Sequence, residues 1–144
     1  TLKSRCLNFK IQLTSNQSIE ITNNILENNY NKFLNEDFVN NYSTPGEILN
    51  LIDFANKNDI DLIETNLKDL IKKIIMDKLY KKNNSIKNLI YSLIEFYFRK
   101  NVSVTNMKLI TSYNYFLRKI DNTKTFNLDE ETLFMEFEDS ILNG

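Results

Sequence analysis

Apolar residues recur at intervals of three and four from about position 60 to the end of this 144-residue sequence. This spacing places them on one face of an α-helix, because an α-helix has about 3.6 residues per turn. Helix-breaking residues are scarce, with one proline and two glycines in the chain. The sequence therefore predicts a mainly α fold that ends in a helical bundle. The predicted apolar faces are Ile63, Leu67, Leu70, Ile71 and Ile74; Ile86, Leu89, Ile90, Leu93, Ile94 and Tyr97; Leu109, Ile110, Tyr113, Phe116, Leu117 and Ile120; and Leu133, Phe134, Phe137 and Ile141.

The N-terminal part has a different pattern. Apolar and polar residues alternate from Leu7 to Leu13, which predicts one short, half-buried strand. Thr14 and Gln17 have the spacing of a capping box, so a helix is expected at about 15–28. Its apolar face is predicted to contain Ile19, Thr22, Ile25 and Leu26.

A second helix start is indicated at Ser43-Thr44-Pro45-Gly46-Glu47. Thr44 is suited to cap this helix, Pro45 to occupy its first position, and Glu47 to complete a capping box. The following Lys57-Asn58-Asp59 marks a hinge. We therefore expect a small domain at 1–56 and a helical bundle at 57–144, whose short connections at 81–85 and 122–127 predict antiparallel neighbours.

Composition excludes several classes of chemistry within this stretch. There is no histidine and one cysteine, Cys6, so neither a catalytic triad nor a structural zinc site is expected, and we predict no metal. Neither glycine belongs to a Walker-type phosphate loop. The net charge of −1 gives no large positive field for coating nucleic acid. No apolar run approaches the ~20 residues of a membrane span, which favours a cytoplasmic protein.

Three charged clusters have structural explanations that outweigh functional ones. The acidic pairs near positions 59, 130 and 136 lie at helix starts or on polar faces, where carboxylates are solvated or act as caps. The run Phe96-Tyr97-Phe98-Arg99-Lys100 has residues that stack on single-stranded bases, but helix core followed by a basic last turn is the better interpretation. Lysines between Lys72 and Lys82 suit the end of a helix, and contact with phosphate is left open.

One short motif carries a resemblance to a known family. Arginine is rare here, with three in the chain, and Arg5 stands between Ser4 and Cys6 directly before the predicted strand. By spacing alone, it reads as a surface arginine beside a buried cysteine. However, Ser4-Arg5-Cys6 resembles the SRC motif of sliding-clamp loader subunits of the AAA+ family. The capped helix at Thr44 and the helical stretch after it are similar to the lid and collar of those subunits, so the resemblance covers essentially the whole chain.

Within this family, the resemblance is greatest to the bacterial delta-prime class, which does not hydrolyse ATP. ATP-binding subunits carry a sensor-2 arginine in the last lid helix, and the alignment puts Gly46 at that position. The Thr44-Pro45-Gly46 sequence and the segment 127–134 are also similar to delta-prime. The resemblance implies a non-ATPase structural subunit of the DNA polymerase III holoenzyme, with no cofactor bound by this segment.

The resemblance further implies that Arg5 is an arginine finger acting in trans on ATP and Mg²⁺ held by a neighbouring subunit, with Ser4 and Cys6 supporting it. The implied partners are the gamma/tau and delta subunits of a hetero-pentamer, with the sliding clamp and primer-template DNA contacted through the complex, in the bacterial cytoplasm. The sequence lacks the AAA+ nucleotide-binding domain and a zinc module. It begins with Thr1, and we expect the natural chain to start upstream.

Two alternatives remain open from sequence. The first is the lid and collar of an ATP-hydrolysing gamma/tau-type subunit with a diverged sensor-2 position. An intact phosphate loop and Walker B motif upstream would favour it. The second is a free-standing helical adaptor or DNA-binding module, in which the Ser4-Arg5-Cys6 motif is coincidental.

Overall fold

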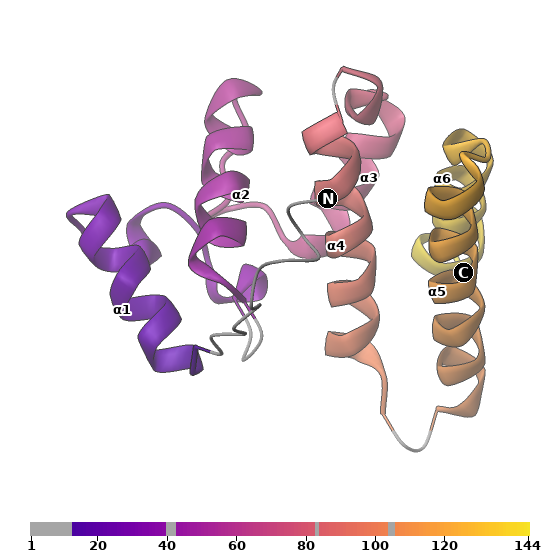
Figure 1. Cartoon of the computed structure of the whole chain (residues 1–144), viewed down its shortest axis with the longest axis horizontal. Coiled ribbons are helices and arrows are strands. Elements are labelled where there is room, and N and C mark those ends of the chain that lie inside the picture. Colours follow the sequence, from indigo (N-terminus) through magenta and orange to yellow (C-terminus); the bar gives the residue numbers. More distant parts are fainter. Residues whose placement is uncertain (1–12, 40–42, 83, 104–105) are drawn as a thin grey trace, which may run out of the picture.

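The computed structural model describes residues 13–39, 43–82, 84–103 and 106–144. This part of the chain has six α-helices and no sheet, which confirms the predicted mainly α fold (Figure 1). Short 3₁₀ turns and a closing π-helical turn, η5, connect or extend the helices. The elements are α1 (Ser15–Leu26), η2 (Tyr30–Lys32), η3 (Glu36–Phe38), α2 (Pro45–Lys57), α3 (Leu67–Met76), η4 (Leu79–Lys81), α4 (Asn84–Asn101), α5 (Met107–Phe126), α6 (Glu130–Phe137) and η5 (Glu138–Leu142).

Both predicted capping boxes are formed. At α1, the backbone N–H of Gln17 donates to the Thr14 hydroxyl, while the Gln17 side chain accepts from the Thr14 N–H. At α2, Thr44 and Glu47 make the same reciprocal pair, and Pro45 occupies the first helical position. Each box satisfies backbone donors that a helix start leaves without partners. These starts are therefore fixed by side chains within three residues of each other.

Most helix contacts join elements that are close in the chain. α1 packs on α2, α2 on α4, α3 on α4, α4 on α5, and α5 on α6, with η5 reaching back to α3 (Figure 1). A single apolar cluster contains buried side chains from all of these helices except α1. It includes Phe54 before the predicted domain boundary and Leu62 after it. The division at residue 56 stays a prediction, with α2 ending at Lys57 and Asp59 in the left-handed conformation (φ 52°).

Three phenylalanine rings join the C-terminal helices. Phe98 of α4, Phe116 of α5 and Phe137 of α6 are all at least 98% buried, and their ring centroids lie 5.3–5.8 Å apart. Edge-on and tilted contacts at these distances are favourable for aromatic pairs. The rings therefore hold α4, α5 and α6 at one point of the core.

The buried face of α1 differs from the prediction. Thr22 is buried as expected, together with Ser18, and the Thr22 hydroxyl donates to the Ser18 carbonyl at 2.7 Å. Ile25, predicted to face the core, is 57% exposed, and Ile21 is 37% exposed. The hydrogen bond of the Thr22 hydroxyl offsets the cost of burying this polar group. The prediction that Ile25 is a core residue was therefore wrong.

The prediction that Ile63 lies on the apolar face of a helix was also wrong. It lies in a turn before α3 and is 47% exposed, because the Asp61 carboxylate accepts from its backbone N–H and Asn66 caps the helix three residues later. The same turn is held by the Asn35 amide, which donates to the Ile63 carbonyl at 2.9 Å. With this long-range contact in place, α3 begins at Leu67, later than the apolar spacing from Ile63 predicts.

Two further predictions concern segment ends. The expected connection at 122–127 is helical up to Phe126, so α5 and α6 are joined by a shorter link. The predicted strand at Leu7–Leu13 lies outside the described residues except for Leu13, which is 42% exposed.

The core position of Leu93 gives a stability prediction. Leu93 on α4 is 5% exposed, so Leu93→Ala removes buried apolar atoms and leaves a cavity. We expect the free energy of unfolding to fall by about 2–5 kcal/mol in a urea titration. Met135→Ala is the control, because Met135 is 55% exposed. A change of less than ~0.5 kcal/mol for Leu93→Ala would contradict its assignment to the core.

Candidate functional site

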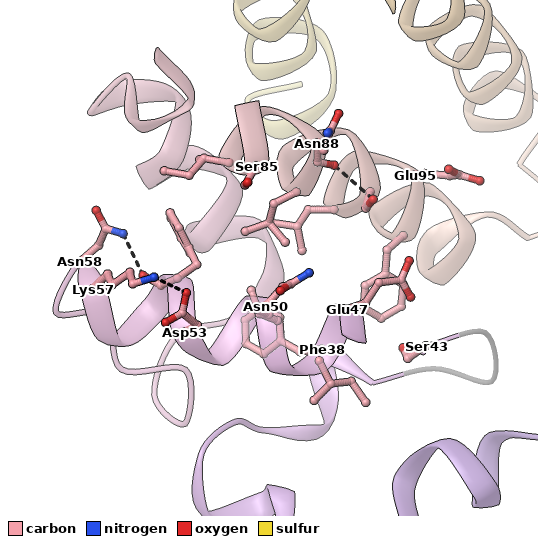
Figure 2. Close-up of a pocket in the computed structure, with 18 of the residues that line it drawn as sticks. Phe38, Ser43, Glu47, Asn50, Asp53, Lys57, Asn58, Ser85, Asn88 and Glu95 are labelled. Carbon is pink, nitrogen blue, oxygen red and sulfur yellow. Dashed lines mark hydrogen bonds and ion pairs between the residues drawn. The ribbon is translucent and has the colours of Figure 1, made fainter. Parts of the chain in front are cut away.

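A groove of about 720 Å³ lies between α2 and α4, and we call it the α2/α4 groove. The two helices are antiparallel here, since the C-terminal end of α2 lies beside the N-terminal end of α4 (Figure 2). Lys82 just before α4 donates to the side chain of Asn58 just after α2 at 3.1 Å, which joins the two helices at that end. A volume of this size is in the range of pockets that bind ligands or partner segments.

The floor of the groove is apolar. It is formed by Ile48, Leu51 and Phe54 of α2 and by Leu89, Leu93 and Phe96 of α4. Leu89 and Phe96 are only half-buried, whereas the other four are buried. The floor thus keeps two large apolar side chains of α4 partly open to the groove.

The walls of the groove are polar. Asn50 of α2 and Asn88 of α4 are exposed on opposite walls, and Ser85 and Ser92 lie on the α4 side (Figure 2). The Ser92 hydroxyl donates to the Asn88 carbonyl at 3.2 Å. These walls offer uncharged donors and acceptors above an apolar floor.

The charged groups of the groove are distributed unevenly. Lys57, Lys82 and Asp53 line one end, which gives two positive charges against one negative charge, a net charge of +1. Glu47, Glu95 and Arg99 line the other end, which gives one positive charge against two negative charges, a net charge of −1. Asp53 and Lys57 form an ion pair at 2.6 Å along α2, and Glu95 and Arg99 form one along α4. Hydrogen bonds from Arg99 to Tyr113 and Glu95 raise the pKa of the guanidinium.

Gly46, the predicted sensor-2 position, lies in the exposed first turn of α2, next to the groove-lining Glu47. A Cβ atom added at Gly46 would meet no atom within 4 Å. The backbone there does not have a positive φ. Neither space nor backbone conformation therefore requires glycine at this position.

The motif Ser4-Arg5-Cys6 lies outside the described residues, so the structure does not place it relative to Gly46 or the groove.

Two lysines of the basic cluster form ion pairs within the fold. Lys78 and Lys81 each lie 2.6 Å from a carboxylate oxygen of Glu131 at the start of α6. Hydrogen bonds from both lysines lower the pKa of Glu131, and the same contact raises the pKa of Lys81. These two lysines thus serve an internal contact between η4 and α6.

The aromatic and basic run at 96–100 is also used within the fold. Phe98 is 1% exposed in the core, while Lys100 pairs with Asp37 at 2.5 Å and so ties α4 to η3. This confirms the interpretation as helix core followed by a basic last turn. The buried Phe98 ring is not available for stacking on a base.

Three further acidic residues also have partners within the fold. Glu130 pairs with Lys87 at 2.6 Å, and Asp129 caps α6 by accepting from the backbone N–H of Thr132. Glu136 accepts from Lys119 and from the Tyr115 hydroxyl, and these bonds lower its pKa. Within the described ranges, no group of three or more His, Cys, Asp or Glu residues could hold a metal ion.

Sequence periodicity did not identify the groove. Leu89, Ile90 and Ile94 were predicted on one stripe of α4, but Ile90 and Ile94 are buried in the core, whereas Leu89 is half-buried and lines the groove. Phe96 lies outside the predicted stripe and also lines the groove, so this extra apolar residue was the available signal.

None of the helices in the described segments is both long and apolar enough to cross a membrane. The chain matches no family model, no curated protein and no solved structure.

The open surroundings of Gly46 predict that glycine is dispensable for folding. Gly46→Ala should raise the free energy of unfolding by up to ~1 kcal/mol in a urea titration, because alanine has the lower conformational entropy cost in a helix. Ala55→Gly in the same helix is the opposite control, at a buried position, and should be destabilising. A loss of stability in Gly46→Ala would show that glycine is structurally required there.

The Glu131 contact predicts a pH dependence of stability. Its pKa is below the ordinary value of 4.5 in the folded chain, so its contribution is fully present above pH 4.5 and is lost as the pH falls through the folded pKa. Glu131→Gln should therefore lower the free energy of unfolding at pH 7 and have a smaller effect at pH 3. Urea titrations at both pH values measure this, with Glu64→Gln, in an exposed turn, as the control. Equal losses at both pH values would contradict a role for the ionised carboxylate.

Proposed function

We propose that this chain is the lid and collar region of a non-ATPase, delta-prime-like subunit of a bacterial sliding-clamp loader, and that its work is assembly. The observation that carries the proposal is the combination of Ser4-Arg5-Cys6 with the helix start at Thr44-Pro45-Gly46-Glu47, followed by an all-helical stretch. A capping box with Pro45 at the first position of α2 agrees with the helix start that the resemblance requires. The mainly α architecture of the described residues is compatible with a lid followed by a collar.

In this proposal, Arg5 acts on ATP and Mg²⁺ that a neighbouring subunit holds. A guanidinium is planar and permanently charged, so it can contact two phosphate oxygens at once as negative charge develops during phosphoryl transfer. Lysine carries the charge but not this paired geometry. Ser4 and Cys6, on either side, would set the position of the Arg5 backbone.

Gly46 supports the non-ATPase assignment. Glycine has no side chain to contact a phosphate, and an arginine at this exposed site would find space, since a Cβ meets nothing within 4 Å. The lack of a charged side chain at position 46 is thus not forced by packing. The chain then binds no nucleotide through this helix, and the ATP-hydrolysing gamma/tau-type alternative is less favoured.

The proposed partners are ATPase subunits of the gamma/tau type and a delta subunit, in a hetero-pentamer that holds primer-template DNA and the sliding clamp. The apolar surface of α5 is compatible with such packing. Ile110 and Leu117 are two turns apart on one face and only half-buried, and Met107 at the helix start is 69% exposed. Burying such side chains against a neighbouring bundle is favourable because it removes apolar area from water.

The test is Arg5→Lys in the full-length chain, reconstituted with its loader partners. We expect DNA-stimulated ATP turnover to fall by at least about tenfold, because arginine fingers in other systems supply ~10³ to 10⁵ in rate. Gel filtration must show that the complex stays assembled. Arg118→Lys, at an exposed position on α5, is the matched control and should leave turnover unchanged.

Unchanged turnover in an assembled Arg5→Lys complex would show that this guanidinium is not a finger. Failure of the unaltered chain to assemble with gamma/tau and delta subunits would contradict the clamp-loader assignment as a whole. The two outcomes are separate, because assembly is measured before turnover.

A further inference from the structure

The apolar stripe of α4 is wide. Ile90, Ile94 and Phe98 are at most 1% exposed and pack in the core. Leu89 and Phe96, seven residues apart, lie at the edge of this stripe, where they contact the core and stay half-buried on the floor of the α2/α4 groove. In this chain α2 covers that edge only in part, because the groove opens between the two helices. Covering the remaining apolar area with another helix is favourable, since it removes that area from water.

The groove has the dimensions of a helix-binding site. Its α2 wall is a helix of 13 residues, which at 1.5 Å per residue is about 20 Å long. Its two walls are antiparallel helices, and its floor is formed by side chains that recur with helical spacing, such as Leu89, Leu93 and Phe96. A third helix of about four turns can place an apolar face on this floor, as in helix-in-groove recognition.

The charges at the two ends of the groove specify the kind of helix. Lys57 and Lys82 give one end its net positive charge, and Glu47 and Glu95 give the other end its net negative charge. Figure 2 shows Lys57 at one end of α2 and Glu47 at the other. An amphipathic helix commonly has acidic residues in its first turn and basic residues in its last turn, since this suits its own dipole. Such a helix is complementary to the groove when it runs parallel to α4, with its acidic turn beside Lys82.

We infer that the α2/α4 groove binds an amphipathic helix of a partner protein, with an acidic first turn at Lys57 and Lys82 and a basic last turn at Glu47 and Glu95. The uncharged walls agree with this occupant. The Asn50 carboxamide lies between α2 and α4 and can both donate and accept, which suits polar side chains at the edge of a bound helix, whereas Asn88 lines the rim and points away from α2 (Figure 2). A polyanion is disfavoured, because the groove has acidic residues at one end and little net charge. This inference does not depend on the clamp-loader proposal.

The test uses a designed peptide of ~14 residues, labelled with fluorescein, with leucines on one face, glutamates in the first turn and lysines in the last turn. Its binding to the full chain is measured by fluorescence anisotropy. A scrambled peptide of the same composition, with its leucines spread around the helix, is the control. We expect saturable binding of the amphipathic peptide, at least about tenfold tighter than that of the scrambled one.

Substitutions then locate the site. Leu89→Glu places a charge on the groove floor and should weaken binding at least about tenfold, whereas Met135→Glu, on the exposed surface of α6, should have no effect. Ser92→Arg is a second blocking variant at an exposed wall position, in case Leu89→Glu does not fold. Circular dichroism verifies that each variant is helical.

A charge exchange tests the orientation. Lys82→Glu should weaken binding by about fivefold, and a peptide with lysines in its first turn should recover that loss. The proposal is overturned if no saturable binding occurs below ~1 mM, if the scrambled peptide binds equally, or if neither Leu89→Glu nor Ser92→Arg weakens binding. Sedimentation measurements that show a dimer of the unaltered chain, disrupted by Ser92→Arg, would assign the groove to a second copy and also overturn it.

Discussion

The contact of Phe98, Phe116 and Phe137 is the interaction on which the C-terminal helices depend. Each ring comes from a different helix, and none is more than 2% exposed. Without these rings, α5 would have few buried side chains, because only Phe116, Ile120 and Thr123 of its 20 residues are buried. The aromatic contact therefore fixes where α5 and α6 lie against α4. The same helix also packs against α2 and α3.

Ion pairs on the surface join particular elements around this core. Glu131 joins α6 to η4 through Lys78 and Lys81, and Lys100 joins α4 to η3 through Asp37. Exposed ion pairs contribute little stability individually, but they select one arrangement of helices among those that apolar burial alone would allow. They also show that Lys78 and Lys81 of the basic cluster serve a contact within the fold.

The two functional proposals rest on different parts of the chain. The clamp-loader assignment depends on Ser4-Arg5-Cys6 and on the Thr44 helix start, and it concerns ATP on a neighbouring subunit. The inferred helix site depends on the half-buried Leu89 and Phe96 of α4 and on charges at the ends of the groove. Glu47 belongs to both regions, since it completes the α2 capping box and also lines the acidic end of the groove. Either proposal can fail while the other holds.

The sequence by itself determined the mainly α fold and the starts of α1 and α2. The capping boxes at Thr14 and Thr44 involve partners three residues apart, so local spacing is sufficient to predict them. Tertiary structure alone decided that Ile25 faces outward, that a turn replaces helix at Ile63, and that Lys78 pairs with Glu131, 53 positions later. The groove belongs to this second class, because its walls come from two helices whose separation depends on how each packs elsewhere. Apolar periodicity states which side of a helix is buried, but not against which neighbour or how completely.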